Sequence, residues 1–366
     1  MRILAVDVGT GTQDILVFDT GAPVENCVKL VMPSATAIAA ERIRRATRAG
    51  RPVVLSGQVQ GGGPCAWALE DHLRAGLRAF ATPEAAATFD DDLDKVRAMG
   101  VDIVGEDEAA GAAGDRVRLR DLDLDAVRAA LAAFEVDGRF DGFAVGCLDH
   151  GAAPPDYSDR LFRFDHLKSV IERGNDLLSF AYLPEELPAY LTRARALIRC
   201  IDADAPAVFL DTGPAAALGA LQDPVVGRQE TGLVLNLGNM HALAFLLRGT
   251  RILALYEHHT GEMTDAQIED FTRRLVSGDL RHEEVYASQG HGVLYAAEGA
   301  GRAASAGTLR PAVTGPRRNR LRDSRLEPYF AAPHGDMMLS GCFGMVAAFA
   351  RRHPQHAEEI ERALFS

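Results

Sequence analysis

Apolar and polar residues alternate along the first part of the chain. The alternation runs over residues 2–33 and is interrupted by turn-forming residues at 9–12 and 19–23. Because successive side chains of a strand point to opposite faces of a sheet, this period of two predicts a meander of antiparallel strands. A helix is predicted to follow over residues 37–49, with Gly50 as its end.

Two short apolar runs further along predict buried strands at 143–148 and 207–210. Each run ends in an acid, Asp149 and Asp211, and His150 follows the first of them. In open α/β sheets, ligands bind beyond the carboxyl ends of the strands. We therefore expect these three polar residues to lie at a site.

Residues 85–125 are rich in alanine and acids and show little apolar periodicity. They follow a predicted buried strand at 52–55, and we interpret them as a peripheral insertion. Their acid run, which includes Asp91, is predicted to be a solvated surface, because nothing nearby fixes the geometry of a cation site.

The opening pattern returns in the second half of the chain. Strands are predicted at 233–237, 241–247 and 252–256, and a helix follows with Thr264 as N-cap, Gln267 in the capping-box position and Gly278 as its end. Two such units indicate an internal duplication. Since chains of this length usually divide into domains, we expect an N-terminal lobe over 1–222, which carries the insertion, and a C-terminal lobe over 223–366.

Composition excludes several partners. The chain of 366 residues has a formal net charge of -12, which repels a phosphate backbone and argues against nucleic acid. Its apolar runs are far shorter than the ~20 residues that span a bilayer, so no membrane partner is expected. The N-terminus lacks the apolar core of a signal peptide, and we expect a cytoplasmic protein.

The sharpest local motif is Asp7-Val8-Gly9-Thr10-Gly11-Thr12, at the tip of the first predicted hairpin. Glycines let backbone amides approach phosphate oxygens, threonine hydroxyls add donors, and an acid before the turn can hold a hydrated Mg²⁺. The motif taken alone is equally compatible with a plain Gly-Thr hairpin turn.

Further segments follow this motif in order: Gly213-Pro214-Ala215-Ala216-Ala217-Leu218-Gly219-Ala220, Leu235-Asn236-Leu237-Gly238, Val313-Thr314-Gly315-Pro316 and Ser340-Gly341-Cys342-Phe343-Gly344-Met345. Together they resemble the connecting helix, the second phosphate loop and the adenosine-side segments of the superfamily of actin, sugar kinases and heat-shock chaperones. Within it, the chain is most similar to an uncharacterised bacterial and archaeal family of actin-like ATPase domains often labelled "putative pyruvate formate-lyase-activating enzyme".

The resemblance implies an α/β fold of two ribonuclease H-like lobes, with mixed sheets and a central cleft that binds ATP and Mg²⁺. It places Mg²⁺ near Asp7 and Asp211, with Asp7, Asp149 and Asp211 as the catalytic acids. The residues that it assigns to the nucleotide are Gly9, Thr10, Gly11, Thr12, Asn236, Gly238, Asn239, Gly315 and Gly341.

Two departures from known patterns bear on the chemistry. Asn236 stands where many members of the superfamily have an aspartate, and an amide cannot accept a proton as a base. A radical activase needs a Cys-x-x-x-Cys-x-x-Cys motif for its iron–sulfur cluster, and the five cysteines of this chain are scattered without one.

Histidines form a second group of candidates, because several lie at predicted strand ends or in glycine-rich loops. We expect them to converge in the cleft as a polar site for a substrate or a divalent metal, although each could instead be an ordinary hydrogen-bonded loop residue. They are His150, His258, His259, His291 and His334.

Three functions remain open at this point. The protein could be an ATPase or kinase that acts on a small-molecule substrate or on a partner enzyme. It could be a non-catalytic nucleotide sensor or scaffold, as Asn236 allows. It could also be a metal-dependent enzyme that uses the cleft histidines.

Overall fold

The first half of the chain builds a mixed sheet around the predicted meander. The computed structural model describes residues 1–297 and 309–365. In this sheet β1, β2 and β3 are antiparallel, β8 and β10 run parallel to β1, and β9 closes the edge. The strands are β1 (Arg2–Val8), β2 (Thr12–Asp19), β3 (Val28–Pro33), β8 (Gly142–Cys147), β9 (Ala181–Tyr182) and β10 (Ala207–Leu210).

The second half repeats this topology. Here β11, β12 and β13 form the antiparallel meander, β15 and β16 run parallel to β11, and β14 is added at the opposite edge. The strands are β11 (Thr231–Leu237), β12 (His241–Arg248), β13 (Arg251–His259), β14 (Gly292–Tyr295), β15 (Ala312–Thr314) and β16 (Tyr329–Phe330). The duplicated, ribonuclease H-like, two-lobed fold predicted from the sequence is thereby confirmed.

Two helices pack against each other between the sheets, namely α9 (Thr212–Ala220) and α13 (Ser340–Arg352). Their backbones approach so closely that a Cβ on Gly219 would lie 1.7 Å from the carbonyl oxygen of Ser340, which explains the small residues of both helices. One apolar core contains residues of both sheets and both helices. The two lobes therefore share a packed interface.

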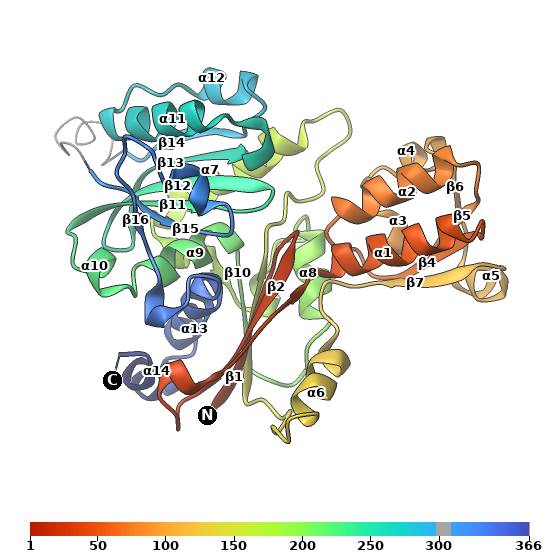
Figure 1. The fold of residues 1–366 in the computed structure, drawn as a ribbon, viewed down its shortest axis with the longest axis horizontal. Helices are drawn as coiled ribbons and strands as arrows, with labels where there is room; N and C mark the ends of the chain where they lie inside the picture. The colour runs from red at the N-terminus through yellow and green to blue at the C-terminus, as the bar shows by residue number, and fades with distance from the viewer. Residues whose placement is uncertain (298–308, 366) are drawn as a thin grey trace.

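The remaining helices of the two lobes either cover the outer faces of the sheets or pack into the apolar core between the sheets, to which residues 164–171 and 360–364 contribute (Figure 1). The predicted capping box is confirmed in α11, where Thr264 and Gln267 cap each other across the first turn and Gly278 ends the helix. These helices are α6 (Leu124–Ala132), α7 (Asp159–Gly174), α8 (Thr192–Ile198), α10 (Pro224–Gly227), α11 (Asp265–Ser277), α12 (His282–Ala287) and α14 (Ala357–Phe365).

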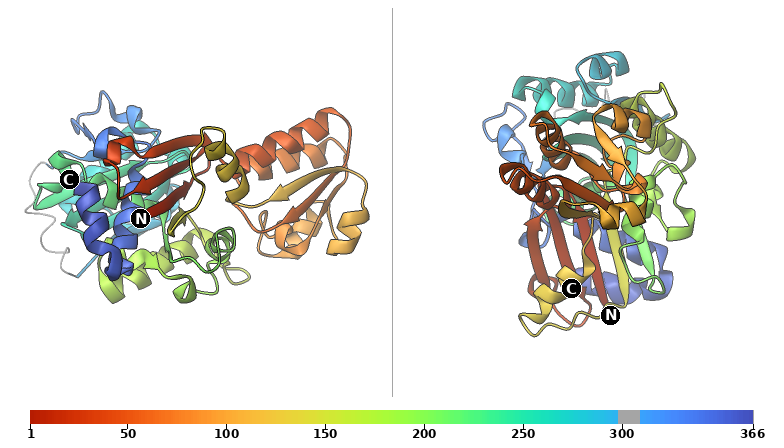
Figure 2. Two further views of the ribbon diagram at one scale, coloured as in Figure 1. Left: turned by 90° about the horizontal axis from the view of Figure 1, so that it is seen from below. Right: turned by 90° about the vertical axis from the view of Figure 1, so that its right-hand side faces the viewer.

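A third sheet projects from the first lobe between β3 and β8 (Figures 1 and 2). Its strands, in the order β6-β5-β4-β7, are all parallel, and it has an apolar core of its own. Its elements are α1 (Ala35–Arg48), β4 (Val53–Gly57), α2 (Pro64–Arg74), β5 (Ala79–Ala81), α3 (Pro83–Ala86), α4 (Leu93–Ala98), β6 (Val101–Ile103), α5 (Glu106–Gly111) and β7 (Asp115–Leu119). The segment 85–125 supplies only part of this module, which also includes elements that precede it.

No helix within residues 1–297 and 309–365 combines the length and the apolar character needed to cross a bilayer.

Candidate functional site

The turn of the first hairpin and the turn that joins β11 to β12 have the same backbone pattern and face each other. The amide of Gly9 donates to the carbonyl of Thr12, and the amide of Gly238 donates to the carbonyl of His241, both at 2.9 Å. The side chain of Asn239 lies against Gly11, where an added Cβ would meet its Nδ2 atom at 2.4 Å. The two predicted phosphate loops therefore touch across the boundary between the lobes.

A cavity of about 80 Å³ lies between these loops. Most of the residues assigned to the nucleotide line it, together with Asp7 and the start of α13. They are Gly9, Thr10, Thr12, Asn236, Gly238, Asn239, Gly315 and Gly341. Gly341 is required for this packing, because a Cβ there would lie 2.1 Å from Oδ2 of Asp7.

Two carboxylates stand side by side in the wall of this cavity. Asp7 on β1 pairs across the hairpin with Asp14 on β2. Burial raises the pKa of Asp7 to about 7, although the hydroxyl of Thr212 donates to its Oδ1 at 2.7 Å. Burial and the neighbouring Asp7 raise the pKa of Asp14 to about 8, and its Oδ1 is buried with no hydrogen-bond partner among the described residues.

Asp14 was missing from the predicted site. The hairpin register predicts that Asp14 lies beside Asp7, because a turn at residues 9–12 places residue 14 opposite residue 7. Asp7 is buried and Asp14 partly buried, and neither forms an ion pair within the described part of the chain, so their charges carry a desolvation cost that a bound cation would relieve.

Asp211 forms a buried ion pair that the sequence did not predict. Its carboxylate is held by the guanidinium of Arg163, with Nη1 2.5 Å from Oδ2 and Nη2 3.0 Å from Oδ1. Oδ1 also caps α9 by accepting from the amide of Gly213 at 3.1 Å. Both oxygens of Asp211 therefore already have protein partners, whereas Oδ1 of Asp14 has none among the described residues.

Arg163 lies at the centre of a buried charge network between the lobes. It is fully buried on α7, and its Nε lies 3.2 Å from Oε2 of Glu257 on β13, which is also fully buried. Burial raises the pKa of Glu257 to about 7 in spite of this guanidinium. The network thus ties Asp211 at the end of β10 to a strand of the second sheet.

A larger cavity of about 440 Å³ adjoins the phosphate loops. Its wall includes Gly9, Gly238 and Asp149, and the third module contributes the loop of residues 60–63. Asp149 accepts the amides of Gly151 at 2.8 Å and Ala194 at 2.9 Å, and burial raises its pKa.

Two charged residues in this wall were not predicted as site residues. Arg193 pairs with Asp121 at 2.6 Å and donates to the carbonyl of Leu148 at 2.8 Å. Asp91 also lines the cavity, and partial desolvation raises its pKa to about 6. Its side chain is nevertheless exposed, as are those of Asp92 and Asp94, which agrees with the predicted solvated surface.

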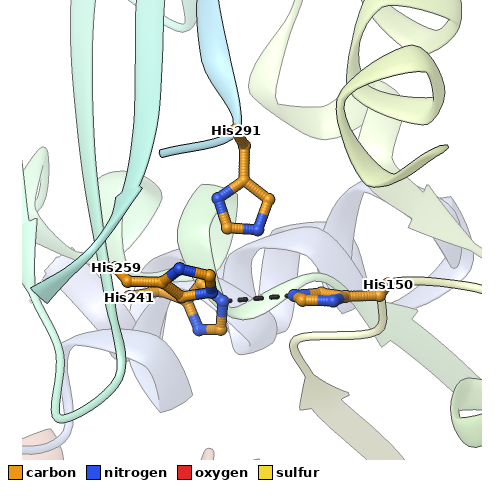
Figure 3. Close-up of side chains that lie close together, drawn as sticks. All are labelled: His150, His241, His259 and His291. Atoms are coloured by element: carbon orange, nitrogen blue, oxygen red, sulfur yellow. Dashed lines mark hydrogen bonds between the residues drawn. The ribbon is translucent and has the colours of Figure 1, made fainter. Parts of the chain in front are cut away.

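Four histidines converge beside this cavity (Figure 3). His150 follows β8, His241 begins β12, His259 ends β13 and His291 precedes β14. One ring nitrogen from each lies within 4.8 Å of those of the other three. Nε2 of His150 and Nε2 of His241 are 3.1 Å apart.

The predicted set of histidines is partly brought together. His150, His259 and His291 meet, whereas His258 turns away and contacts the hydroxyl of Ser288 at 3.1 Å through Nε2. His334 lies elsewhere, with its Nε2 atom 2.8 Å from Oε1 of Gln222. Because side chains alternate along a strand, His258 and His259 cannot both face the cluster.

His241 is the member that the prediction lacked. It is the equivalent of Thr12 in the duplicated hairpin, and it lies directly across the β12–β13 pair from His259. Once the register of the β12–β13 hairpin is known, the sequence shows that His241 and His259 are cross-strand neighbours.

The duplicated sheets and the two facing loops define a chain with the two-lobed actin-like fold. Within that class, the chain belongs to the family described as "Putative pyruvate format-lyase activating enzyme (DUF1786)", whose model matches residues 60–320. The family expected from the sequence is confirmed. No protein with a curated description matches this chain.

Solved structures of low sequence identity are also similar. The activator of 2-hydroxyisocaproyl-CoA dehydratase from Clostridium difficile, with bound ADPNP, is 11% identical, with 98% of each chain covered and a TM-score of 0.34. The ethanolamine utilization protein EutJ from Carboxydothermus hydrogenoformans is 12% identical, with 95% of this chain and 89% of that chain covered and a TM-score of 0.31.

A ROK hexokinase from Thermus thermophilus is 15% identical, with 69% of this chain covered and a TM-score of 0.24. The chain spans 48% of the length of that hexokinase and 38% of a ROK family transcriptional regulator.

Proposed function

We propose that this protein binds ATP with Mg²⁺ between its two lobes and uses it for phosphoryl transfer or for ATP-driven action on a partner enzyme. The observation that carries the proposal is that Gly9 and Gly238, from the two duplicated turns, line one cavity. Glycine turns let main-chain amides approach phosphate oxygens from both sides.

Asp7 and Asp14 fit the role of Mg²⁺ ligands, either directly or through water. Their raised pKa values reflect buried negative charge, and Oδ1 of Asp14 has no hydrogen-bond partner in the described part of the chain. Mg²⁺ prefers one or two carboxylates together with water and phosphate oxygens, and it would neutralise charge on the transferred phosphate. Asp14 would then supply the carboxylate that Asn236 lacks.

The small size of the inner cavity implies a hinge motion. Its volume of about 80 Å³ is well below that of ordinary ligand pockets, which span roughly 300–1,000 Å³. A whole nucleotide would therefore enter only when the lobes move apart and would favour closure by contacting both loops.

The outer cavity is the proposed place for the acceptor. Its volume of about 440 Å³ suits a small molecule, and it is continuous with the phosphate loops through Gly9 and Gly238. Asp149 is the proposed base in this wall: each of its oxygens keeps one lone pair beyond the backbone amide that it accepts, and a raised pKa suits a base that works near neutral pH.

Calorimetric titration with MgATP and MgADP tests the binding step. Wild-type protein is expected to bind both, and Asp7→Ala is expected to weaken binding at least tenfold, equivalent to about 1.4 kcal/mol. The surface variant Asp94→Ala serves as a matched control, because its side chain is exposed on the third module. Absence of nucleotide binding by folded wild-type protein contradicts the proposal.

Turnover is measured separately. Phosphate release that disappears in Asp7→Ala supports an ATPase or kinase, whereas tight binding without release favours the nucleotide sensor or scaffold that Asn236 allows.

A further inference from the structure

We infer that His150, His241, His259 and His291 together bind a first-row transition metal ion of the Zn²⁺ type. The four residues come from four separate segments of the chain. His150 belongs to the first lobe and the other three to the second. Their convergence therefore depends on the assembly of the two lobes rather than on local sequence.

The geometry of the cluster is that of an inward-facing ligand set. The rings point towards a common centre (Figure 3), and the ligand nitrogens all lie within 4.8 Å of one another. In a tetrahedral site with bonds of about 2.0–2.1 Å, ligand nitrogens lie about 3.3 Å apart. The Nε2 atoms of His150 and His241 are already at 3.1 Å, and the other rings need only side-chain adjustments to close around an ion.

Hydrogen bonding around the cluster leaves lone pairs free for a metal. Nδ1 of His259 lies 2.9 Å from the backbone carbonyl of Gln289, a contact in which Nδ1–H donates and Nε2 keeps its lone pair. His291 is fully buried, and neither of its ring nitrogens has a hydrogen-bond partner among the described residues. An unsatisfied buried imidazole is costly, and a bound cation would accept its lone pair.

The electrostatic surroundings favour neutral imidazoles, which are the form that binds metals. Burial lowers the pKa of all four histidines, and Arg163 contributes for His150, His241 and His291. Arg163 itself is paired with Asp211 and Glu257 in the buried network.

The ligand type selects the class of ion. Imidazole nitrogen suits Zn²⁺, Cu²⁺, Ni²⁺ and Fe²⁺, whereas Mg²⁺ and Ca²⁺ require oxygen ligands. The site is thus distinct from the carboxylate pair proposed to hold Mg²⁺. Three of the four histidines also line the 440 Å³ cavity, so the ion would stand in the wall of the proposed acceptor pocket.

The metal site is linked to the second phosphate loop through the backbone of His241, whose carbonyl accepts the amide of Gly238 at 2.9 Å. In the closed arrangement of the lobes, the ion would be held by His241 next to this loop and by His150 of the opposite lobe. The inference holds whether or not the protein turns over ATP, because it depends only on the ligand set.

Metal analysis of the full-length protein tests the inference. We expect protein purified without chelator to carry close to one equivalent of Zn²⁺ or of another transition metal. Chelator-treated protein is expected to take up one equivalent of Co²⁺ with the visible absorption of a tetrahedral nitrogen site, and an excess of Mg²⁺ should not displace it.

Single substitutions His150→Ala and His241→Ala are expected to weaken Co²⁺ binding at least about tenfold, the lower end of what the loss of an outer-shell partner costs. His334→Ala is the matched control and should bind as the wild type does, since His334 lies outside the cluster. Circular dichroism and the Tm of each metal-free variant establish that it is folded.

A second measurement separates metal binding from folding defects. Zn²⁺ should raise the Tm of the wild type and of His334→Ala but not that of the double variant His150→Ala/His241→Ala. Folded wild-type protein that takes up no transition metal, or cluster variants that bind it with unchanged affinity, would overturn the inference.

Discussion

Replacing Arg163 with methionine should destabilise the protein strongly, because it leaves the buried carboxylates of Asp211 and Glu257 without a positive partner. Arg163 and Glu257 are fully buried, and Asp211 is 4% exposed. Methionine has a similar length but no charge, so the substitution keeps most of the packing and removes both ion pairs at once. Breaking a buried ion pair by removing one partner costs about 3–5 kcal/mol.

The expected loss of folding stability can be measured by thermal unfolding at neutral pH. At about 2 °C per kcal/mol, which is the low end for domains of 150–250 residues, the Tm should fall by about 6–10 °C. The matched control is Arg48→Met, because Arg48 and Glu41 form an exposed pair at 2.8 Å. Exposed pairs contribute less than about 1 kcal/mol, so this control should change the Tm little.

The charge explanation also predicts a rescue. In the triple variant Arg163→Met/Asp211→Asn/Glu257→Gln no ionised group is left without a partner, and asparagine can still cap α9 in place of Asp211. Most of the lost stability should return. An Arg163→Met protein as stable as the wild type, or a triple variant no better than the single one, would refute the reasoning.

The other predictions concern stability and the carboxylate pair. Because the pKa values of Asp7 and Asp14 are raised to about 7 and about 8 in the folded protein, their contribution to stability is fully present below about pH 4 and is lost as the pH rises through 7–8. Asp14→Asn should therefore raise the Tm of metal-free protein more at pH 8 than at pH 5, and a difference independent of pH would contradict this. Mg²⁺ is expected to stabilise the wild type and not this variant, as monitored by thermal melts with and without the ion. Gly219→Ala should destabilise by about 1–3 kcal/mol through the clash with Ser340, and unchanged melting would show that α9 and α13 can move apart. Thr264→Ala should cost about 1 kcal/mol by removing the cap of α11, and circular dichroism should show no loss of helix beyond its first turn.

Local patterns were sufficient to predict the two antiparallel meanders and the helix α11. The period of two over residues 2–33 and its return after residue 233 identified both meanders, and the capping residues located α11. These features are encoded by neighbours in sequence, since strand alternation and helix capping depend on residues only a few positions apart. The duplicated fold was predicted from the return of this pattern together with the family resemblance, whose motifs are also short and local.

Tertiary structure alone decided which polar side chains share a site. Asp211 was predicted to face a ligand at the end of β10. The structure places Arg163 of α7 within hydrogen-bond distance of both of its carboxylate oxygens. Asp14 and His241 became site residues through strand register, and His258 lost its place because alternation turned it away from His259. Short-range patterns thus indicated the two meanders and the duplicated fold, whereas the meeting of four histidines from two lobes depends on how the lobes pack. The physical reason is that the cluster joins residues up to 141 positions apart in the chain, as for His150 and His291. Local periodicity reflects only residues a few positions apart, so it cannot predict such a contact.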